Sequence, residues 1–194
     1  MIRHDWGLIT YELAELKMNN IHKQARDGGC NHLILCQHPN IYTLGQDAWN
    51  TDFDVNTYKT DRGGSISAHS PGQNIYYFCF HTPHPVLFYS KVIAVFEAFF
   101  KKYLPLVVYD KARPGFYLEN KKLLSLGFRY KQGVSLHGIA LNVCTDLDFH
   151  NVIRPCNLEG IRSSSLEAEG LRLNATEINE EIVERICEVF DESV

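Results

Sequence analysis

The stretch that most constrains the fold runs from Asn74 to Phe80 and has the sequence Asn-Ile-Tyr-Tyr-Phe-Cys-Phe. It is almost wholly apolar and aromatic, which is the composition of a β-strand buried on both faces. Such a strand belongs to a sheet with other elements packed against it. Together with the elements below, it predicts one α+β domain over residues 1–194, with a mostly antiparallel sheet and packed helices.

A first helix is predicted over residues 11–26, where apolar residues recur at helical spacing. Thr10 is suited to cap its N-terminus, and Gly28-Gly29 is a suitable stop. We expect these residues on or near its buried side: Leu13, Leu16 and Ile21.

Two further helices are predicted, over residues 86–103 and 177–191, the second capped by Thr176. The 86–103 segment has a broad aromatic stripe that is typical of a core-facing helix: Phe88, Val92, Val95, Phe96, Phe99 and Phe100. The last helix is expected to turn four residues inward: Ile178, Ile182, Ile186 and Val189.

Short apolar runs bounded by turn residues predict the remaining strands. These cover residues 32–37, 41–44, 55–58, 106–109, 115–118, 122–130 and 134–143. The segment 149–160 has no such pattern and is expected to be irregular.

Composition excludes several functional classes. The 194 residues carry a formal charge of −4, which argues against general nucleic-acid binding. The six cysteines show no C-x-x-C spacing, and no apolar run is long enough to span a bilayer. With no basic-then-apolar leader at the start of the sequence, these features predict a cytoplasmic protein with free thiols and no membrane association.

The segment from Asp61 to Gln73 has the most unusual composition in the chain, with three glycines, a proline, an arginine and a histidine between two predicted strands. Its plainest interpretation is a long hairpin loop, but loops of this length in compact domains are more often functional. The G-x-x-x-x-G-K-[ST] pattern of a nucleotide P-loop is absent. His69 could contact a ligand or brace the loop, and Arg62 could bind a carbonyl or anionic group or pair with Asp61.

Cys156 and Lys122 are candidates for nucleophilic chemistry. Cys156 lies in the polar, rigid context Arg154-Pro-Cys-Asn157, where a thiol would stay accessible. Lys122 begins an apolar strand, and a partly desolvated lysine has a depressed pKa and can act as a base. Each also has an ordinary explanation, as an inert thiol or as a strand-end lysine that reaches solvent.

Two other sites are weakly supported. A Cys–His–Asn protease triad could be assembled from Cys156, His137 and Asn142, but five positions along one strand place the last two on opposite faces. A zinc site would need paired histidine or cysteine ligands, and that spacing is missing, so no metal is expected.

Several motifs together resemble the lipoyl(octanoyl) transferases. Residues 62–73, Arg-Gly-Gly-Ser-Ile-Ser-Ala-His-Ser-Pro-Gly-Gln, are similar to that family's R-G-G-x-x-T-x-H-x-P-G-Q signature, with Ser67 in place of threonine. Residues 122–129, 137–143 and 155–156 match later motifs in the same order, and residues 7–17 and 38–45 resemble earlier ones. The resemblance covers most of the chain before Gly160.

The resemblance implies an octanoyl-[acyl carrier protein]:protein N-octanoyltransferase whose fold is shared with lipoate and biotin protein ligases. It makes Cys156 the acyl-thioester nucleophile and Lys122 its partner, with no cofactor or nucleotide. The residues implied to line the substrate pocket are Arg62, Gly63, Gly64, Ser65, Ile66, Ser67, Ala68, His69, Ser125, Leu126, Gly127, Gly138, Ile139 and Ala140. Asn157 departs from the usual glycine after the cysteine, and Gln37 from an acidic residue that is common before His-Pro.

The implied partners are octanoyl-acyl carrier protein as donor, and lipoyl domains of 2-oxoacid dehydrogenase complexes and the glycine cleavage H protein as acceptors. Because carrier proteins are acidic, a local basic surface is expected from Lys101, Lys102, Lys111, Arg113, Lys121, Arg129 and Lys131. Three alternatives remain open: an ATP-dependent lipoate or biotin ligase, a cysteine-based lipoyl amidotransferase, and a catalytically inactive module that binds a carrier or lipoyl domain.

Overall fold

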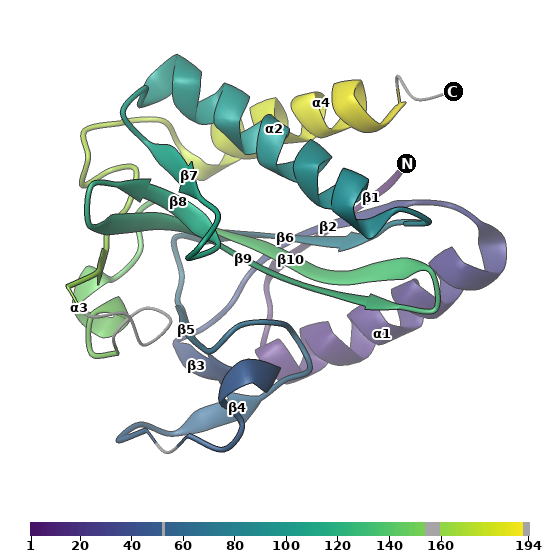
Figure 1. Ribbon diagram of the computed structural model, residues 1–194, viewed down its shortest axis with the longest axis horizontal. Helices are drawn as coiled ribbons and strands as arrows, with labels where there is room; N and C mark the ends of the chain where they lie inside the picture. The colour runs from purple at the N-terminus through teal and green to yellow at the C-terminus, as the bar shows by residue number, and fades with distance from the viewer. Residues whose placement is uncertain (52, 154–159, 192–194) are drawn as a thin grey trace.

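The computed structural model describes residues 1–51, 53–153 and 160–191, and its larger sheet is built around the apolar strand of residues 74–80 (Figure 1). That strand is β6 (Gln73–Cys79), and every residue in it is buried. The strand order is β1-β2-β6-β10-β9-β8-β7, with β11 pairing β9. The other bounds are β1 Ile2–Leu8, β2 His32–Gln37, β7 Val108–Asp110, β8 Gly115–Leu118, β9 Lys121–Lys131, β10 Val134–Asn142 and β11 Arg162–Ser163.

A smaller sheet has β3 (Ile41–Leu44) at its centre, flanked by β4 (Thr57–Lys59) and β5 (Ile66–His69). A short 3₁₀ helix, Gln46–Ala48, follows β3. Most strand pairs in the two sheets are antiparallel, as predicted, and the parallel exceptions are β1–β2, β9–β11 and β3–β4.

Helices and the small sheet form layers on the two faces of the large sheet (Figure 1). Helices α2 (Pro85–Tyr103) and α4 (Ala175–Asp191) lie together on one face, where their apolar residues join the larger core cluster. Helix α1 (Tyr11–Gly28) packs on the opposite face, where the small sheet and the short helix α3 (Leu147–His150) also lie. The expected α+β architecture is therefore confirmed.

The buried face of α1 differs from the prediction. Leu13 and Leu16 are 49% and 61% exposed. The buried residues follow the alternative helical stripe Tyr11, Ala14, Met18, His22 and Ala25. Alanines at two of these positions let the helix backbone approach the sheet closely, which two leucines would not. The predicted cap holds, because Thr10 Oγ1 accepts a hydrogen bond from the Leu13 backbone N–H.

The cap of α4 also differs. Asn174 Oδ1 accepts from the Glu177 N–H at 2.9 Å, and Glu177 Oε2 accepts from the Asn174 N–H at 2.9 Å. This reciprocal pair is a capping box built on Asn174, so Thr176 lies inside the helix instead of capping it. Ile178, Ile182 and Ile186 are fully buried, as predicted.

Three strands were missing from the predicted set: β1, β5 and the two-residue β11. The segment 61–73 is not one long loop, because β5 within it pairs with β3 through the register Ile41–His69 to Leu44–Ile66. At the other end of the chain, β1 is a mostly exposed edge strand with polar residues between its apolar ones, and it pairs in parallel with β2.

Candidate active site

Two adjoining pockets lie between the β9–β10 hairpin and the small sheet. The larger, about 490 Å³, is called here the apolar pocket, and the smaller, about 320 Å³, the lysine pocket. Ile66, Ser67 and Ser125 line both, so the two spaces meet at these residues. The apolar pocket is lined by Tyr11, Arg62, Gly64, Ile66, Ser67, His69, Ile75, Tyr77, Ser125, Leu126, Gly127, His137, Gly138, Ile139 and Ala140.

Most residues of the predicted substrate pocket line the apolar pocket. Ala68 lines the lysine pocket instead, beside Lys122, Gln73, Asn142 and His150. Gly63 and Ser65 line neither; their carbonyls accept hydrogen bonds from Arg62 at 3.0 and 2.8 Å. Sequence reasoning missed Tyr11, Ile75 and Tyr77, which line the apolar pocket from α1 and β6 and which their positions in amphipathic or apolar segments marked only as core.

A β-bulge turns Lys122 toward the pocket. Phe116 pairs with Leu124 and Tyr117 pairs with Lys122, so Leu123 is an extra residue in β9. Bulges of this kind re-aim the neighbouring side chain. In a regular strand Lys122 would share the face of Leu124, which is part of the core beneath α2. With the bulge, Lys122 lines the same pocket as Ser125.

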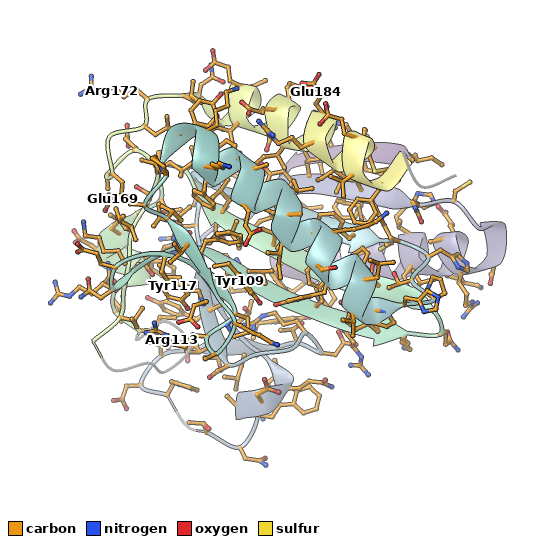
Figure 2. All side chains as sticks on the ribbon, turned by 45° about the horizontal axis from the view of Figure 1, so that its top comes forward. Tyr109, Arg113, Tyr117, Glu169, Arg172 and Glu184 are labelled. Atoms are coloured by element: carbon orange, nitrogen blue, oxygen red, sulfur yellow. The ribbon has the colours of Figure 1, made fainter. Side chains whose placement is uncertain are left out.

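Lys122 is only 2% exposed, and the residues around it accommodate both its ammonium group and its aliphatic stem. Its Nζ lies 5.4 Å from the centre of the Tyr117 ring, whose hydroxyl donates to the Arg113 carbonyl at 2.8 Å. Figure 2 shows Arg113 and Tyr117 beside one another at this end of the sheet. A Cβ on Gly115 would lie 2.7 Å from Lys122 Cε, so the glycine makes room for the lysine stem.

Cys156 lies outside the described residues. Ile153 and Ser163 both line the lysine pocket, and Ser163 pairs with Lys122 in the β9–β11 ladder. Chain on both sides of residues 154–159 is therefore anchored beside Lys122.

Arg62 organises the glycine-rich segment from inside. Its side chain is 9% exposed and donates to the carbonyls of Gly63, Ser65 and Thr43 and to the Thr43 hydroxyl. Asp61, by contrast, pairs with Arg129 at 2.7 Å and with His137 at 2.6 Å. The guanidinium therefore shapes the loop through backbone carbonyls.

A chain of hydrogen bonds links this arginine to β10. Arg62 Nη2 donates to Thr43 Oγ1 at 2.9 Å, which leaves the threonine hydroxyl to donate to His69 Nε2 at 3.1 Å. His69 Nδ1 then donates to Gln73 Oε1 at 2.7 Å, and Gln73 Nε2 donates to Asn142 Oδ1 at 2.8 Å. Because donors and acceptors alternate consistently, His69 is fixed as the neutral tautomer protonated at Nδ1.

The same series of hydrogen bonds continues to β9, the strand that contains Lys122. Asn142 Nδ2 donates to the Ser164 carbonyl at 2.8 Å, and the Ser164 N–H donates to the Lys122 carbonyl at 2.9 Å. We call the series Arg62–Thr43–His69–Gln73–Asn142 the relay. It connects the glycine-rich wall of the pockets to the backbone of Lys122 through buried groups only.

Burial keeps His69, Tyr77 and Tyr11 neutral in the apolar pocket. It lowers the pKa of His69 well below its ordinary value, an effect that nearby His38 and Arg62 reinforce. Burial likewise raises the pKa of Tyr77 and of Tyr11 above their ordinary values. Arg62 is the charged residue of this lining, and its N–H groups donate to backbone carbonyls. The neutral groups around it suit an aliphatic ligand better than a charged one.

His137 and Asn142 lie on the same side of β10, contrary to the prediction of opposite faces. His137 has a φ of +61°, in the left-handed region, which interrupts the alternation of side chains. A non-glycine residue in this conformation costs about 1–3 kcal/mol. The two residues line different pockets, and five residues of strand separate them by roughly 17 Å, too far for a triad.

Neither a metal site nor a membrane span is evident in the described part of the chain. No group of three or more histidine, cysteine or acidic side chains there is placed to hold a metal ion. No helix there combines the length and apolar character needed to cross a bilayer.

The predicted basic surface is largely neutralised by local partners. Lys102 pairs with Glu181, Lys121 with Glu169, Arg113 with Asp110 and Arg129 with Asp61. Exposed ion pairs of this kind contribute little stability, but they reduce the local positive field. Lys101, Lys111 and Lys131 are the remaining candidates for an acidic carrier.

Residues 11–189 match the family described as the lipoyl protein ligase A/B catalytic domain. The chain belongs to this family. The matched span includes both pockets and the whole relay.

Two relatives of the chain carry the name octanoyltransferase. The chain is 32% identical to a probable octanoyltransferase of Pyrobaculum calidifontis, over 98% of this chain and 85% of that protein. It is 34% identical to an octanoyltransferase of Wigglesworthia glossinidia brevipalpis, over 90% of this chain and 80% of that protein. The protein is therefore an enzyme of the acyltransferase class.

Solved structures of ligases share the fold. LipL1 of P. falciparum, solved in complex with lipoate, has a TM-score of 0.72 and 10% sequence identity, covering 100% of this chain and 63% of that one. The biotin protein ligase of Leishmania major has a TM-score of 0.62 and 11% identity, covering 98% of this chain and 75% of that one. At these identities the likeness establishes the fold shared by lipoate and biotin ligases.

Proposed function

We propose that the enzyme transfers an octanoyl group from octanoyl-acyl carrier protein to a lysine of a lipoyl domain, through a thioester on Cys156. The observation that carries the proposal is the joined pair of pockets. A buried lysine occupies the polar one, and the apolar one opens from it at Ile66, Ser67 and Ser125. A reacting carbonyl fits the first space and an aliphatic chain the second.

The reach of the chain allows Cys156 to join Lys122. Ile153 lines the lysine pocket, and residue 156 follows three residues later, a span of at most about 11 Å. Ser163, on the other side, pairs directly with Lys122. The proposal places the Cys156 thiol within this radius, facing Lys122 Nζ.

The reaction needs two acyl transfers. In the first, the Lys122 amine takes the Cys156 proton, the thiolate attacks the donor thioester carbon, and the carrier thiolate leaves with that proton. In the second, the acceptor lysine amine attacks the acyl-cysteine, the carbon–sulfur bond breaks, and the amine proton passes by way of Lys122 to the cysteine. One thioester replaces another and then yields a more stable amide, so no nucleotide is consumed.

Ser67 and Ser125 would bind the carbonyl that reacts. Both are half-buried and line both pockets, at the point where the head group meets the chain. Hydroxyl donors at this junction can stabilise the oxyanion that develops during each attack.

The test is to incubate the enzyme with octanoyl-carrier protein and measure its intact mass. A gain of one octanoyl group, abolished in Cys156→Ala and released by a lipoyl domain as acceptor, supports the proposal. Lys122→Met should slow acylation of Cys156 without abolishing substrate binding. An acylated Cys156→Ala variant would refute the assignment of the nucleophile.

The same assay separates the alternative activities. Free octanoate with ATP, offered in place of the carrier thioester, supports transfer only if the enzyme is a ligase. An octanoylated lipoyl domain as sole donor supports transfer only if it is an amidotransferase. Stable binding of a lipoyl domain with no acyl turnover would indicate an inactive binding module.

A further inference from the structure

We propose that His137, held by Asp61, closes the far end of the apolar pocket and selects both the length of the acyl chain and the chemistry of its terminus. This inference rests on the proposed function, because it assumes that the apolar pocket holds the acyl chain. It assigns to His137 a specificity role at the end opposite to Lys122.

The backbone at His137 is bent to present the ring on the pocket side. In a regular strand His137 would share the face of Leu141, which belongs to the core beneath α2 and α4. With φ at +61°, the ring packs edge-on against Tyr77 at 6.3 Å instead and lines the apolar pocket. A strained residue in an otherwise regular strand is a common sign of a functional constraint.

Asp61 fixes which ring nitrogen carries the proton. Asp61 Oδ1 lies 2.6 Å from His137 Nε2, and Asp61 Oδ2 pairs with Arg129 at 2.7 Å. A carboxylate paired with arginine accepts hydrogen bonds, so Nε2 carries the hydrogen and Nδ1 is a bare acceptor. The hydrogen bond to His137 and the charge of Arg129 both lower the pKa of Asp61, which keeps it ionised.

Nδ1 of His137 is buried and has no hydrogen-bond partner among the described residues. The residue is 1% exposed. Buried polar atoms are almost always paired, with protein, water or ligand, so an unpaired acceptor on the wall of a pocket indicates a place for a donor. The other walls near it are apolar or aromatic: Ile75, Tyr77 and Ile139.

The β9–β10 ladder gives the distance between the two ends. Ser125 pairs with Ala140 where the pockets meet, and Phe128 pairs with His137 three positions further along, a distance of about 10 Å. An extended alkyl chain advances about 1.27 Å per bond, so the seven bonds between the first and last carbons of an octanoyl group span roughly 9 Å. The methyl end of that chain therefore comes to rest beside His137, and two more methylenes would run into the ring.

Two specificities follow. Chains longer than octanoyl are disfavoured, because they must displace a ring that Asp61 and Tyr77 hold in place. A chain that ends in a hydroxyl is tolerated, since its O–H can donate to Nδ1. An apolar pocket without this acceptor would reject the hydroxylated chain, because the hydroxyl would lose its hydrogen bonds to water.

The test compares octanoyl-, decanoyl- and 8-hydroxyoctanoyl-carrier protein as competing donors for wild type and His137→Asn. Asparagine tolerates left-handed backbone, so the variant keeps the strand while it shortens the side chain. Gln132→Asn is the matched control, because Gln132 also has a left-handed φ, at the turn of the same hairpin and outside the pockets. Binding of octanoate, decanoate and 8-hydroxyoctanoate, measured by calorimetry, gives a readout independent of turnover.

Wild type should prefer octanoyl to decanoyl by at least about tenfold, and His137→Asn should lose most of that preference by gaining decanoyl transfer. Wild type should accept the hydroxylated chain within about tenfold of octanoyl, and His137→Asn should discriminate against it more strongly. An unchanged length profile in His137→Asn, or rejection of 8-hydroxyoctanoyl by wild type by about 100-fold, overturns the inference. Failure of wild type to transfer any octanoyl group would instead refute the proposed function.

If His137→Asn does not fold, the wild-type binding series still decides the matter. Octanoate and 8-hydroxyoctanoate of similar affinity, both tighter than decanoate, support a terminal acceptor. Decanoate bound as tightly as octanoate excludes a closed end at His137.

Discussion

Replacing Gln73 with leucine would break the relay at its centre. Leucine has a similar volume but leaves His69 Nδ1–H without an acceptor and removes the donor to Asn142 Oδ1. Each buried polar group left unsatisfied costs about 1–3 kcal/mol, and the extra apolar surface of leucine offsets part of the total. We expect a net loss of about 3 kcal/mol, which in a domain of this size lowers the melting temperature by roughly 6–12 °C.

The same substitution should slow catalysis, because Asn142, the last member of the relay, donates to the Ser164 carbonyl, and the Ser164 N–H donates to the Lys122 carbonyl. Displacement of a catalytic group by a fraction of an ångström commonly reduces turnover by tenfold or more, so a drop of about tenfold is expected in octanoyl transfer to a lipoyl domain. The measurements are thermal unfolding and single-turnover acylation of Cys156, at a temperature where both proteins are folded.

Asn179→Leu is the matched control. Asn179 Oδ1 accepts from Asn74 Nδ2 at 2.9 Å and from Tyr76 OH at 2.6 Å, on the α4 side of the sheet. Loss of the Asn179 amide also leaves two donors without this acceptor, but the relay stays intact. This variant should therefore be destabilised and still transfer octanoyl at the wild-type rate. A melting shift below about 2 °C for Gln73→Leu, or equal transfer rates in the two variants, would refute the role given to the relay.

Three further predictions concern stability measured by urea unfolding. Burial lowers the pKa of His150 to about 4, below its unfolded value, so its contribution is complete above about pH 6.5 and is lost as the pH falls toward 4. At pH 5 the loss should be about 2 kcal/mol, and His150→Gln should be less sensitive over the same range; equal slopes would contradict this. Gly138→Ala places a Cβ 2.0 Å from the Tyr76 carbonyl oxygen and should cost about 3 kcal/mol or more, whereas Gly28→Ala, with open space around its Cβ, should not destabilise. Asn174→Ala should cost about 1 kcal/mol through loss of the α4 capping box, and a similar loss in Thr176→Ala would show that the cap is misassigned.

Sequence patterns predicted the elements in which periodicity and composition agree. Helix α2 follows its aromatic stripe, and β6 is buried throughout because each of its side chains meets a covered face. The buried face of α1 could not be predicted in the same way. Its leucines and its small residues form two competing stripes, and the sheet takes the one that allows close approach.

Some features of the candidate site could be predicted from the sequence, and others depend on the folded backbone. The glycine-rich and β9–β10 motifs identified most of the apolar pocket, because residue identity carries that information. The orientations of Lys122 and His137 could not be predicted, since one depends on a bulge at Leu123 and the other on a left-handed residue. Regular alternation of side chains along a strand would instead predict that both Lys122 and His137 face the core beneath α2.

The relay was also beyond sequence reasoning, because its members come from the segment before β5 and from β3, β5, β6 and β10, and they meet only in the folded chain. His69 alone suggested either a ligand contact or a loop brace. Its two bonded nitrogens show that both ring positions are already occupied within the protein.

The bulge beside Lys122 and the left-handed residue at His137 have a joint consequence for how this fold can change over evolution. Both ends of the pocket are built on one hairpin, so the spacing between them is counted in whole strand pairs. Inserting or deleting a single residue between them would turn every following side chain to the other face of the sheet. The spacing between the two ends is thus fixed by the hairpin, so a change in the length of the cavity requires an exchange of side chains and not a single-residue insertion.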